Sequence, residues 1–287
     1  MNGIVIVDKP REWTSQDVTA RLRRVFNTRR IGHGGTLDPM ATGVLPVFVG
    51  RATRGVEFFE HAEKAYEAVL LLGRTTDTED VFGSTLTEQE VNLSEEEFLS
   101  ILPKFRGKIQ QVPPMYSALK VNGQKLCDLA RKGRQVERQP RTVTIHALEC
   151  LAFDGQTARL RVHCSKGTYI RTLCKDIGEA LGCGGCMESL RRVTAGAYKI
   201  EEAVALQTLI DSPAPEAYLL PIDSLFTAYP AVTLTEKQEK RCRNGGSFSC
   251  ELADGIYRAY SKTGEFLALA KADAATLSTV KSFFAVE

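Results

Sequence analysis

The chain has 287 residues, of which 43% are hydrophobic and 25% are charged, and its formal net charge is +2. This length allows one large and one small domain, and the composition is typical of a soluble globular protein. No apolar run approaches the ~20 residues that a membrane-spanning helix needs. The first apolar run is interrupted by Asp8 and follows no basic segment, so no signal peptide is predicted and we expect a cytoplasmic protein.

The net charge conceals an uneven distribution along the chain. Residues 1–54 hold nine Lys/Arg against four Asp/Glu, residues 57–97 hold two against twelve, and residues 98–141 hold ten against two. Two basic blocks that flank an acidic one suggest a surface for a polyanion. Ordinary solvated faces would give the same pattern, so charge alone does not identify a partner.

Eight cysteines are scattered through the chain, which is too long for a disulfide-dense scaffold, and we interpret them as reduced thiols. Cys183 and Cys186 have the spacing of half a zinc site. Because no second pair of ligands completes four, a Gly-rich turn after a helix is favoured and no metal is expected.

The N-terminal elements are predicted in the order strand, helix, loop and strand. Residues 3–7 indicate a buried strand that ends at Lys9-Pro10, and a helix capped at Thr14 or Ser15 should continue to Phe26. A Gly-rich loop at 32–35 leads to Asp38 and then to a strand at 44–49.

Further strands and helices are predicted in the middle of the chain. A strand is expected at 66–72, and Ser94 with Glu97 forms a capping box for a short helix. Prolines make residues 111–116 extended, and a basic helix should follow at 123–132. Strands at 141–153 and 157–165 form a hairpin through the Asp-Gly pair at 154–155, and a helix is expected at 169–181.

A domain boundary is predicted near residues 212–230, where Ser212 to Pro215 and then Tyr229-Pro230 interrupt regular structure. About 55 residues rich in short strands and turns follow. We therefore predict an α+β domain over 1–225 and a small β-rich domain over 230–287.

Asp38 is the first candidate for chemistry, although an Asp-Pro pair is by itself most often a turn former. His33, five residues earlier, could line the same cleft. An aspartyl phosphatase would need a second Asp at position 40, which is Met. No second carboxylate loop of the kind used by aspartic proteases is found, and no convincing partner carboxylate of the glycosidase kind. A hydrolase is therefore disfavoured.

Five sequence blocks carry a strong family resemblance. The stretch from Gly32 to Pro46, GHGGTLDPMATGVLP, resembles the signature of the TruB family, the bacterial tRNA pseudouridine-55 synthases. Four further blocks agree in the same order: KAYE at 64–67 with DTED at 77–80, PMYSALK at 114–120, SKGTYIRT at 165–172, and LRR at 190–192. Together they extend from about residue 3 to 200.

This resemblance implies a pseudouridine synthase fold, with a mixed, largely antiparallel sheet and a central cleft, followed by a PUA-like RNA-binding domain. It assigns the catalytic aspartate to Asp38, the base-stacking aromatic to Tyr66 and the aspartate's basic partner to Arg171. His33 matches the family's histidine near the RNA loop, and Leu190 matches its apolar pocket residue. The basic segment 104–141 resembles the family's RNA-gripping insertion.

The reaction implied breaks the uracil N1–C1′ bond, turns the base in place and rejoins it through C5, so no metal or other cofactor is expected. It needs an ionised carboxylate, which burial would neutralise. A guanidinium opposes that drift through bidentate hydrogen bonds, so we expect an Asp38–Arg171 pair. Tyr66 would stack on the extruded base and is a candidate acceptor for the C5 proton.

Lys9 lies in a family block and is a candidate for substrate binding, but its surroundings depart from the family pattern. The family has Gly near position 12, where this chain has Arg11-Glu12-Trp13. The expected partner is the T-arm of tRNA; neither a membrane nor a protein partner is implied, and we expect a monomer. The alternative function is a tRNA-folding chaperone for which catalysis is secondary.

Overall fold

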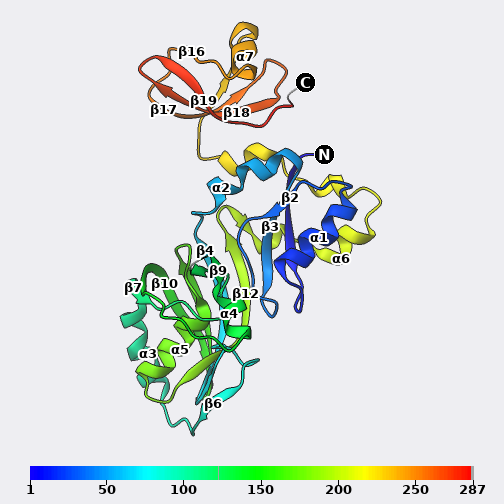
Figure 1. The fold of residues 1–287 in the computed structure, drawn as a ribbon. Helices are drawn as coiled ribbons and strands as arrows, with labels where there is room; N and C mark the ends of the chain where they lie inside the picture. The colour runs from blue at the N-terminus through cyan, green and yellow to red at the C-terminus, as the bar shows by residue number, and fades with distance from the viewer. Residues whose placement is uncertain (122, 286–287) are drawn as a thin grey trace.

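The computed structural model describes residues 1–121 and 123–285, which form a large domain built on one long sheet and a small domain at one end (Figure 1). The large sheet has ten strands. Most neighbours are antiparallel, and only the β1–β14 and β3–β12 pairs run parallel, so the predicted mixed, largely antiparallel sheet is confirmed. Its order is β14 (Val204–Ala205), β1 (Gly3–Lys9), β3 (Thr42–Val49), β12 (Gly185–Ala195), β4 (Lys64–Leu72), β11 (Thr157–Cys164), β10 (Arg141–Phe153) and β7 (Gly107–Gln111), with β2 (Ile31–His33) beside β3 and β13 (Tyr198–Lys199) beside β12.

The N-terminal half of this sheet is buried on both faces. Alternate residues of β1 point to opposite sides, as a strand requires. Val5 and Val7 belong to the core that α1 (Ser15–Val25) covers, whereas Ile4 and Ile6 pack in a second cluster with Phe59 at the end of α2 (Val56–Phe59). The helix predicted to begin at Thr14 or Ser15 and to continue to Phe26 is confirmed as α1. The Thr14 side chain caps it by accepting from the Asp17 backbone N–H.

The other half of the sheet is covered by α5 (Ile170–Ala180), which packs on β12 and β4, and by α3 (Glu95–Ile101). Ser94 caps α3 as predicted. Phe98 of α3 stacks on Phe153 of β10 with ring centroids 4.6 Å apart. A small hairpin of β5 (Arg74–Thr76) and β6 (Thr85–Glu88) projects beyond this end.

The basic segment differs from its prediction in two respects. Its first part, β7, is the edge strand of the large sheet, so only residues 112–140 stand apart from it. The predicted helix at 123–132 is shorter, α4 (Leu126–Arg131), because β8 (Lys120–Val121) and β9 (Gln124–Lys125) pair in a hairpin just before it. Position 122 lies outside the described residues.

The small domain is a five-stranded sheet in the order β15 (Ala231–Thr233), β17 (Gly255–Tyr260), β18 (Phe266–Asp273), β19 (Thr276–Ser282) and β16 (Phe248–Ser249), accompanied by α7 (Glu236–Arg243). It has its own core around Leu234, Leu267 and Leu277. A short 3-10 turn at 222–226 and α6 (Leu206–Asp211) precede it, and Phe226 packs against Phe283 at the junction. Within the described residues, no helix is long and apolar enough to cross a membrane.

The backbone conformation at position 12 is one that suits the glycine of the family pattern better than the glutamate of this chain. Glu12 has φ of 70°, in the left-handed region, and its backbone N–H donates to the Pro39 carbonyl at 2.8 Å. A side chain in this conformation is strained by about 1–2 kcal/mol, whereas glycine adopts it freely. The turn therefore has the shape that glycine favours, although this chain places glutamate there.

We predict that Glu12→Gly raises the free energy of unfolding by about 0.5–1 kcal/mol, because relief of strain exceeds the extra chain entropy of glycine in the unfolded state. Glu12→Ala is the matched control, since it removes the carboxylate but keeps the strain. Urea unfolding of the three proteins measures the effect. Equal stabilisation by alanine and glycine would show that strain is not the cause.

Candidate functional site

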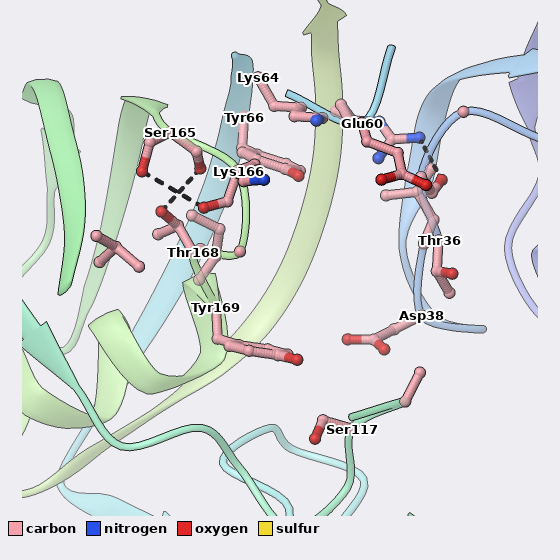
Figure 2. Close-up of a pocket in the computed structure, with 18 of the residues that line it drawn as sticks. Thr36, Asp38, Glu60, Lys64, Tyr66, Ser117, Ser165, Lys166, Thr168 and Tyr169 are labelled. Atoms are coloured by element: carbon pink, nitrogen blue, oxygen red, sulfur yellow. Dashed lines mark hydrogen bonds between the residues drawn. The ribbon is translucent and has the colours of Figure 1, made fainter. Parts of the chain in front are cut away.

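A cavity of about 810 Å³ opens where the loop before β3, strand β4 and the start of α5 meet. Asp38, Tyr66 and Tyr169 project into it from three separate segments, and Ser117 closes it from the basic segment (Figure 2). Its wall therefore combines residues that lie more than 100 positions apart in the chain. Of the predicted site residues, the wall includes His33, Asp38, Tyr66, Arg171 and Leu190.

The loop that carries Asp38 is fixed at its base. Leu37 is buried, and its backbone N–H donates to the Ser15 hydroxyl oxygen at 2.9 Å. The Asp38 carbonyl accepts from the Ala41 N–H at 3.1 Å. Gly34 donates to the Pro46 carbonyl at 2.8 Å. These contacts hold the loop against α1 and β3, so the Asp38 side chain is directed into the cavity by a rigid backbone.

Arg171 joins three segments through one guanidinium group. Its Nε donates to Asp38 Oδ2 at 2.9 Å, and its two terminal nitrogens donate to the carbonyls of Thr78 at 2.9 Å and Tyr116 at 2.8 Å. The Arg171 side chain is only 5% exposed, whereas that of Asp38 is 36% exposed. The expected ion pair is present, but with one hydrogen bond to the carboxylate instead of two, because the other donors hold the backbone.

The segment from Thr78 to Asp80 contacts Arg171 and its neighbour Thr172. Asp80 Oδ2 lies 3.8 Å from Arg171 Nη1, so two carboxylates share one buried cation. Glu79 accepts a 2.6 Å hydrogen bond from the hydroxyl of Thr172, the residue after Arg171. Burial raises the pKa of Glu79, which the Thr172 hydrogen bond partly opposes.

Tyr66 and Leu190 come from neighbouring central strands. In β4, residues 64, 66, 68, 70 and 72 face inward, so the same alternation that builds the core with Leu70 and Leu72 places Tyr66 in the cavity wall. Burial raises the pKa of the Tyr66 hydroxyl, and the adjacent Arg192 opposes this shift. Leu190 contributes an apolar surface to the same wall.

His33 ends β2 and lines the cavity, and its Nδ1 is buried without a hydrogen-bond partner among the described residues. Burial and the Arg192 charge lower its pKa, so the imidazole is neutral near pH 7. A neutral ring can pack against a base without the desolvation penalty that a charged ring would incur.

Lys9 lies behind the site and is not part of the cavity wall. It is fully buried, and its Nζ donates to the carbonyls of Pro10 at 2.9 Å, Trp13 at 2.6 Å and Pro39 at 3.2 Å. Burial lowers the pKa of Lys9 to about 8. The geometry gives Lys9 a role in fixing the loop around Asp38, in place of the direct contact with substrate that the sequence suggested.

Several residues of the cavity wall were assigned no role from the sequence. They are Thr36, Glu60, Lys64, Ser117, Lys166, Tyr169 and Arg192. One signal was present for Arg192, because it follows Leu190 by two positions on a strand and must therefore share its face. Lys64 carries the same signal, because it precedes Tyr66 by two positions on β4. The remaining five depend on which loops meet in space, which the local sequence does not reveal.

Residues 23–170 match the model described as "TruB family pseudouridylate synthase (N terminal domain)", and residues 171–227 match "tRNA pseudouridylate synthase B C-terminal domain". The protein named tRNA pseudouridine synthase B from Clostridium kluyveri is 42% identical over 94% of this chain and 95% of its own length. Its namesake from Pseudomonas fluorescens is 43% identical over 94% of this chain and 91% of its own length.

Solved structures resemble the whole chain. A chain in the crystal structure of a Cbf5-Nop10-Gar1 complex superposes with a TM-score of 0.75 at 26% identity, covering 98% of this chain and 85% of its own. A chain in the structure of an H/ACA RNP bound to a substrate RNA containing 2′-deoxyuridine also gives a TM-score of 0.75, at 24% identity, covering 99% of this chain and 85% of its own. The similarity therefore includes the small C-terminal domain, which the two family models do not reach.

We predict that Lys9→Met lowers the free energy of unfolding by about 2 kcal/mol, because three carbonyls lose a donor and buried acceptors without partners are costly. Lys237→Met, at an exposed position of α7, is the matched control and should be neutral. Thermal or urea unfolding measures both. A Lys9→Met protein as stable as the control would contradict a structural role for this ammonium group.

Proposed function

The chain belongs to the TruB family of pseudouridylate synthases, and from this premise we propose that it converts a uridine in the T-loop of tRNA, at position 55, to pseudouridine. The observation that carries the proposal is the meeting of Asp38, Arg171 and Tyr66 around one cavity. These residues come from three separate blocks of the sequence, and the implied reaction needs all three kinds of group.

Asp38 is the catalytic carboxylate in this proposal. Arg171 binds Oδ2, and Oδ1 has no hydrogen-bond partner within the described part of the chain, so it faces the cavity and is free to act on the nucleotide. Ionised Asp38 would act at the ribose or the uracil ring while the N1–C1′ bond breaks and the base turns to present C5.

The target uridine must leave its stack to reach Asp38, because the carboxylate lies inside a cavity. Extruding a base costs a few kcal/mol, which stacking on an aromatic side chain partly recovers. Tyr66 offers that aromatic face and Leu190 an apolar surface in the same wall, while His33 is placed to fill space left in the RNA loop. The cavity volume of about 810 Å³ is sufficient for an extruded nucleotide.

The RNA backbone is held in this proposal by the basic segment 112–140 beside the cavity. Lys120, Lys125, Arg131, Lys132 and Arg134 are all exposed, and Ser117 to Leu119 of the same segment form part of the cavity wall. Phosphate contacts would provide affinity, and the shape of the T-loop would provide selectivity. We also propose that the C-terminal domain, residues 230–287, is of the PUA type and contacts the same RNA.

The same proposed binding of tRNA by the basic segment supports a second candidate function, a folding chaperone that binds and releases tRNA. It rests on the extent of the exposed basic segment, which reaches beyond the cavity that one nucleotide would occupy. The two functions are compatible, since binding precedes chemistry in both.

We predict that Asp38→Asn abolishes pseudouridine formation while tRNA affinity stays within about threefold of wild type, because Asn keeps the volume and loses the charge. The assay maps pseudouridine in an unmodified tRNA transcript incubated with pure protein, and filter binding measures affinity. Asp211→Asn, at an exposed position of α6 outside segment 112–140 and the cavity wall, is the control. Loss of binding by the Asp38 variant would make Asp38 structural, and absence of product at the T-loop uridine with wild type would refute the proposed function.

We predict that tRNA affinity falls steeply with salt and that replacing Lys125, Lys132 and Arg134 by Gln makes the dependence shallower. Each lost phosphate contact should reduce the slope of log K against log salt by roughly 0.7–0.9. Arg159→Gln is the control, because Arg159 is exposed on the face of β11 opposite the cavity. An unchanged slope in the triple variant would place the phosphate contacts elsewhere.

A further inference from the structure

The cavity contains a buried arginine to which neither the family resemblance nor the proposed chemistry has assigned a role. Arg192 is 1% exposed and lines the cavity, yet it forms no ion pair with any carboxylate in the described structure. Its Nε donates to the Val44 carbonyl at 2.6 Å and one terminal nitrogen donates to the Gly35 carbonyl at 3.2 Å. An arginine buried without a carboxylate is rare, because its desolvation is not repaid by an opposite charge.

The strand register places this arginine against Tyr66. Arg192 of β12 and Tyr66 of β4 are directly paired across the antiparallel ladder, and both side chains are directed to the cavity side. Paired side chains in such a ladder have Cβ atoms about 5 Å apart. The guanidinium therefore adjoins the Tyr66 side chain in the cavity wall, and the two carbonyls of Val44 and Gly35 fix its orientation.

We propose that Arg192 is a positioning residue for Tyr66, whose hydroxyl it orients and whose phenolate form it stabilises for removal of the C5 proton. This inference rests on the proposed function, in which the uracil is rejoined to ribose through C5. At that stage the C5–H bond must break, its electron pair forms the C5=C6 double bond, and the proton moves to the phenolate oxygen. The electrons of the C6=N1 double bond move to N1 at the same time, and N1 takes a proton from water. The resulting phenol returns the proton to water after the product leaves.

The charges around the Tyr66 hydroxyl determine how readily it forms a phenolate, and Arg192 is one of them. A neutral phenol is a very weak base, and burial of Tyr66 raises its pKa above the ordinary value of 10, which makes the phenolate scarcer. The charge of Arg192 opposes this shift, whereas Cys164 and Asp38 raise the pKa of Tyr66 further. Because a guanidinium stays protonated at any physiological pH, its stabilisation of the phenolate does not vary with pH.

The adjacent residue provides a matched control. Arg191 lies on the opposite face of β12, where its guanidinium forms an ion pair with Asp8 at 2.7 Å and is 41% exposed. Arg191→Gln therefore removes the same charge from the same strand without touching the cavity that holds Tyr66.

The first test compares single-turnover rates of pseudouridine formation in Arg192→Gln, Arg192→Lys, Tyr66→Phe, Arg191→Gln and the Tyr66→Phe/Arg192→Gln double variant. Arg192→Gln should slow the reaction about 100-fold, as loss of a proton acceptor does. Arg192→Lys should recover most of the rate. In the Tyr66→Phe background the same change should cost less than about threefold, because the hydroxyl on which it acts is absent. Losses that multiply in the double variant would overturn the proposal.

Substrate carrying deuterium at C5 of the target uridine identifies the affected step. Arg192→Gln should enlarge the isotope effect on the rate, because C5–H cleavage becomes limiting, and Arg191→Gln should not. A slower Arg192→Gln enzyme with an unchanged isotope effect and unchanged tRNA affinity would show that Arg192 acts at another step, which contradicts the proposal.

A measurement without RNA separates this inference from the proposed function. The Cζ signal of Tyr66, labelled with ¹³C-tyrosine and assigned with Tyr66→Phe, reports phenol ionisation. Arg192→Gln should raise the pKa of Tyr66 by at least about one unit, since an opposite charge at this range shifts a pKa by 1–3 units. The same titration midpoint in both proteins, or no ionisation in wild type below pH 11, would overturn the inference even if wild type makes pseudouridine.

Discussion

The guanidinium of Arg171 is the contact on which the rest of the site depends. It has three bonded partners, the Asp38 carboxylate and the carbonyls of Thr78 and Tyr116, and it is almost completely buried. These partners belong to the loop before β3, the segment after β5 and the basic segment. Removing the side chain would leave a carboxylate and two carbonyls without their donor, so one residue determines both the charge of the site and the arrangement of its walls.

The rigidity of Asp38 comes from a second layer of polar contacts on the side away from the cavity. Ser15 at the start of α1 bonds the Leu37 backbone, and Lys9 at the end of β1 bonds the Pro39 carbonyl. Both belong to elements whose apolar residues build the main core. The position of the carboxylate is therefore coupled to the packing of the N-terminal strand and helix, which explains why Lys9 can affect the site without contacting a nucleotide.

The two ends of the cavity differ in their electrostatics. At one end Arg171 is shared between Asp38 and Asp80, so positive and negative charges are matched. At the other, Lys64 and Arg192 are buried beside Tyr66 without a carboxylate partner among the described residues, and burial together with Arg192 lowers the pKa of Lys64 to about 8. An unmatched positive region suits a polyanionic substrate and favours a phenolate more than a neutral phenol. The same charges would make the empty cavity less stable than an apolar one of equal size.

The sequence by itself determined the elements, the family and the identity of the central groups. The strands β1 and β4, the caps at Thr14 and Ser94, and the ordered motif blocks are local properties, and each was readable from neighbouring residues. Only the tertiary structure decided which partners those groups contact. Arg171 donates two hydrogen bonds to backbone carbonyls 93 and 55 residues away, so only one hydrogen bond joins it to Asp38. Lys9 lies behind the loop, a hairpin shortens α4, and Arg192 faces Tyr66 because of the β4–β12 register. These outcomes depend on which distant strands and loops pack together, and a linear pattern does not encode that packing residue by residue.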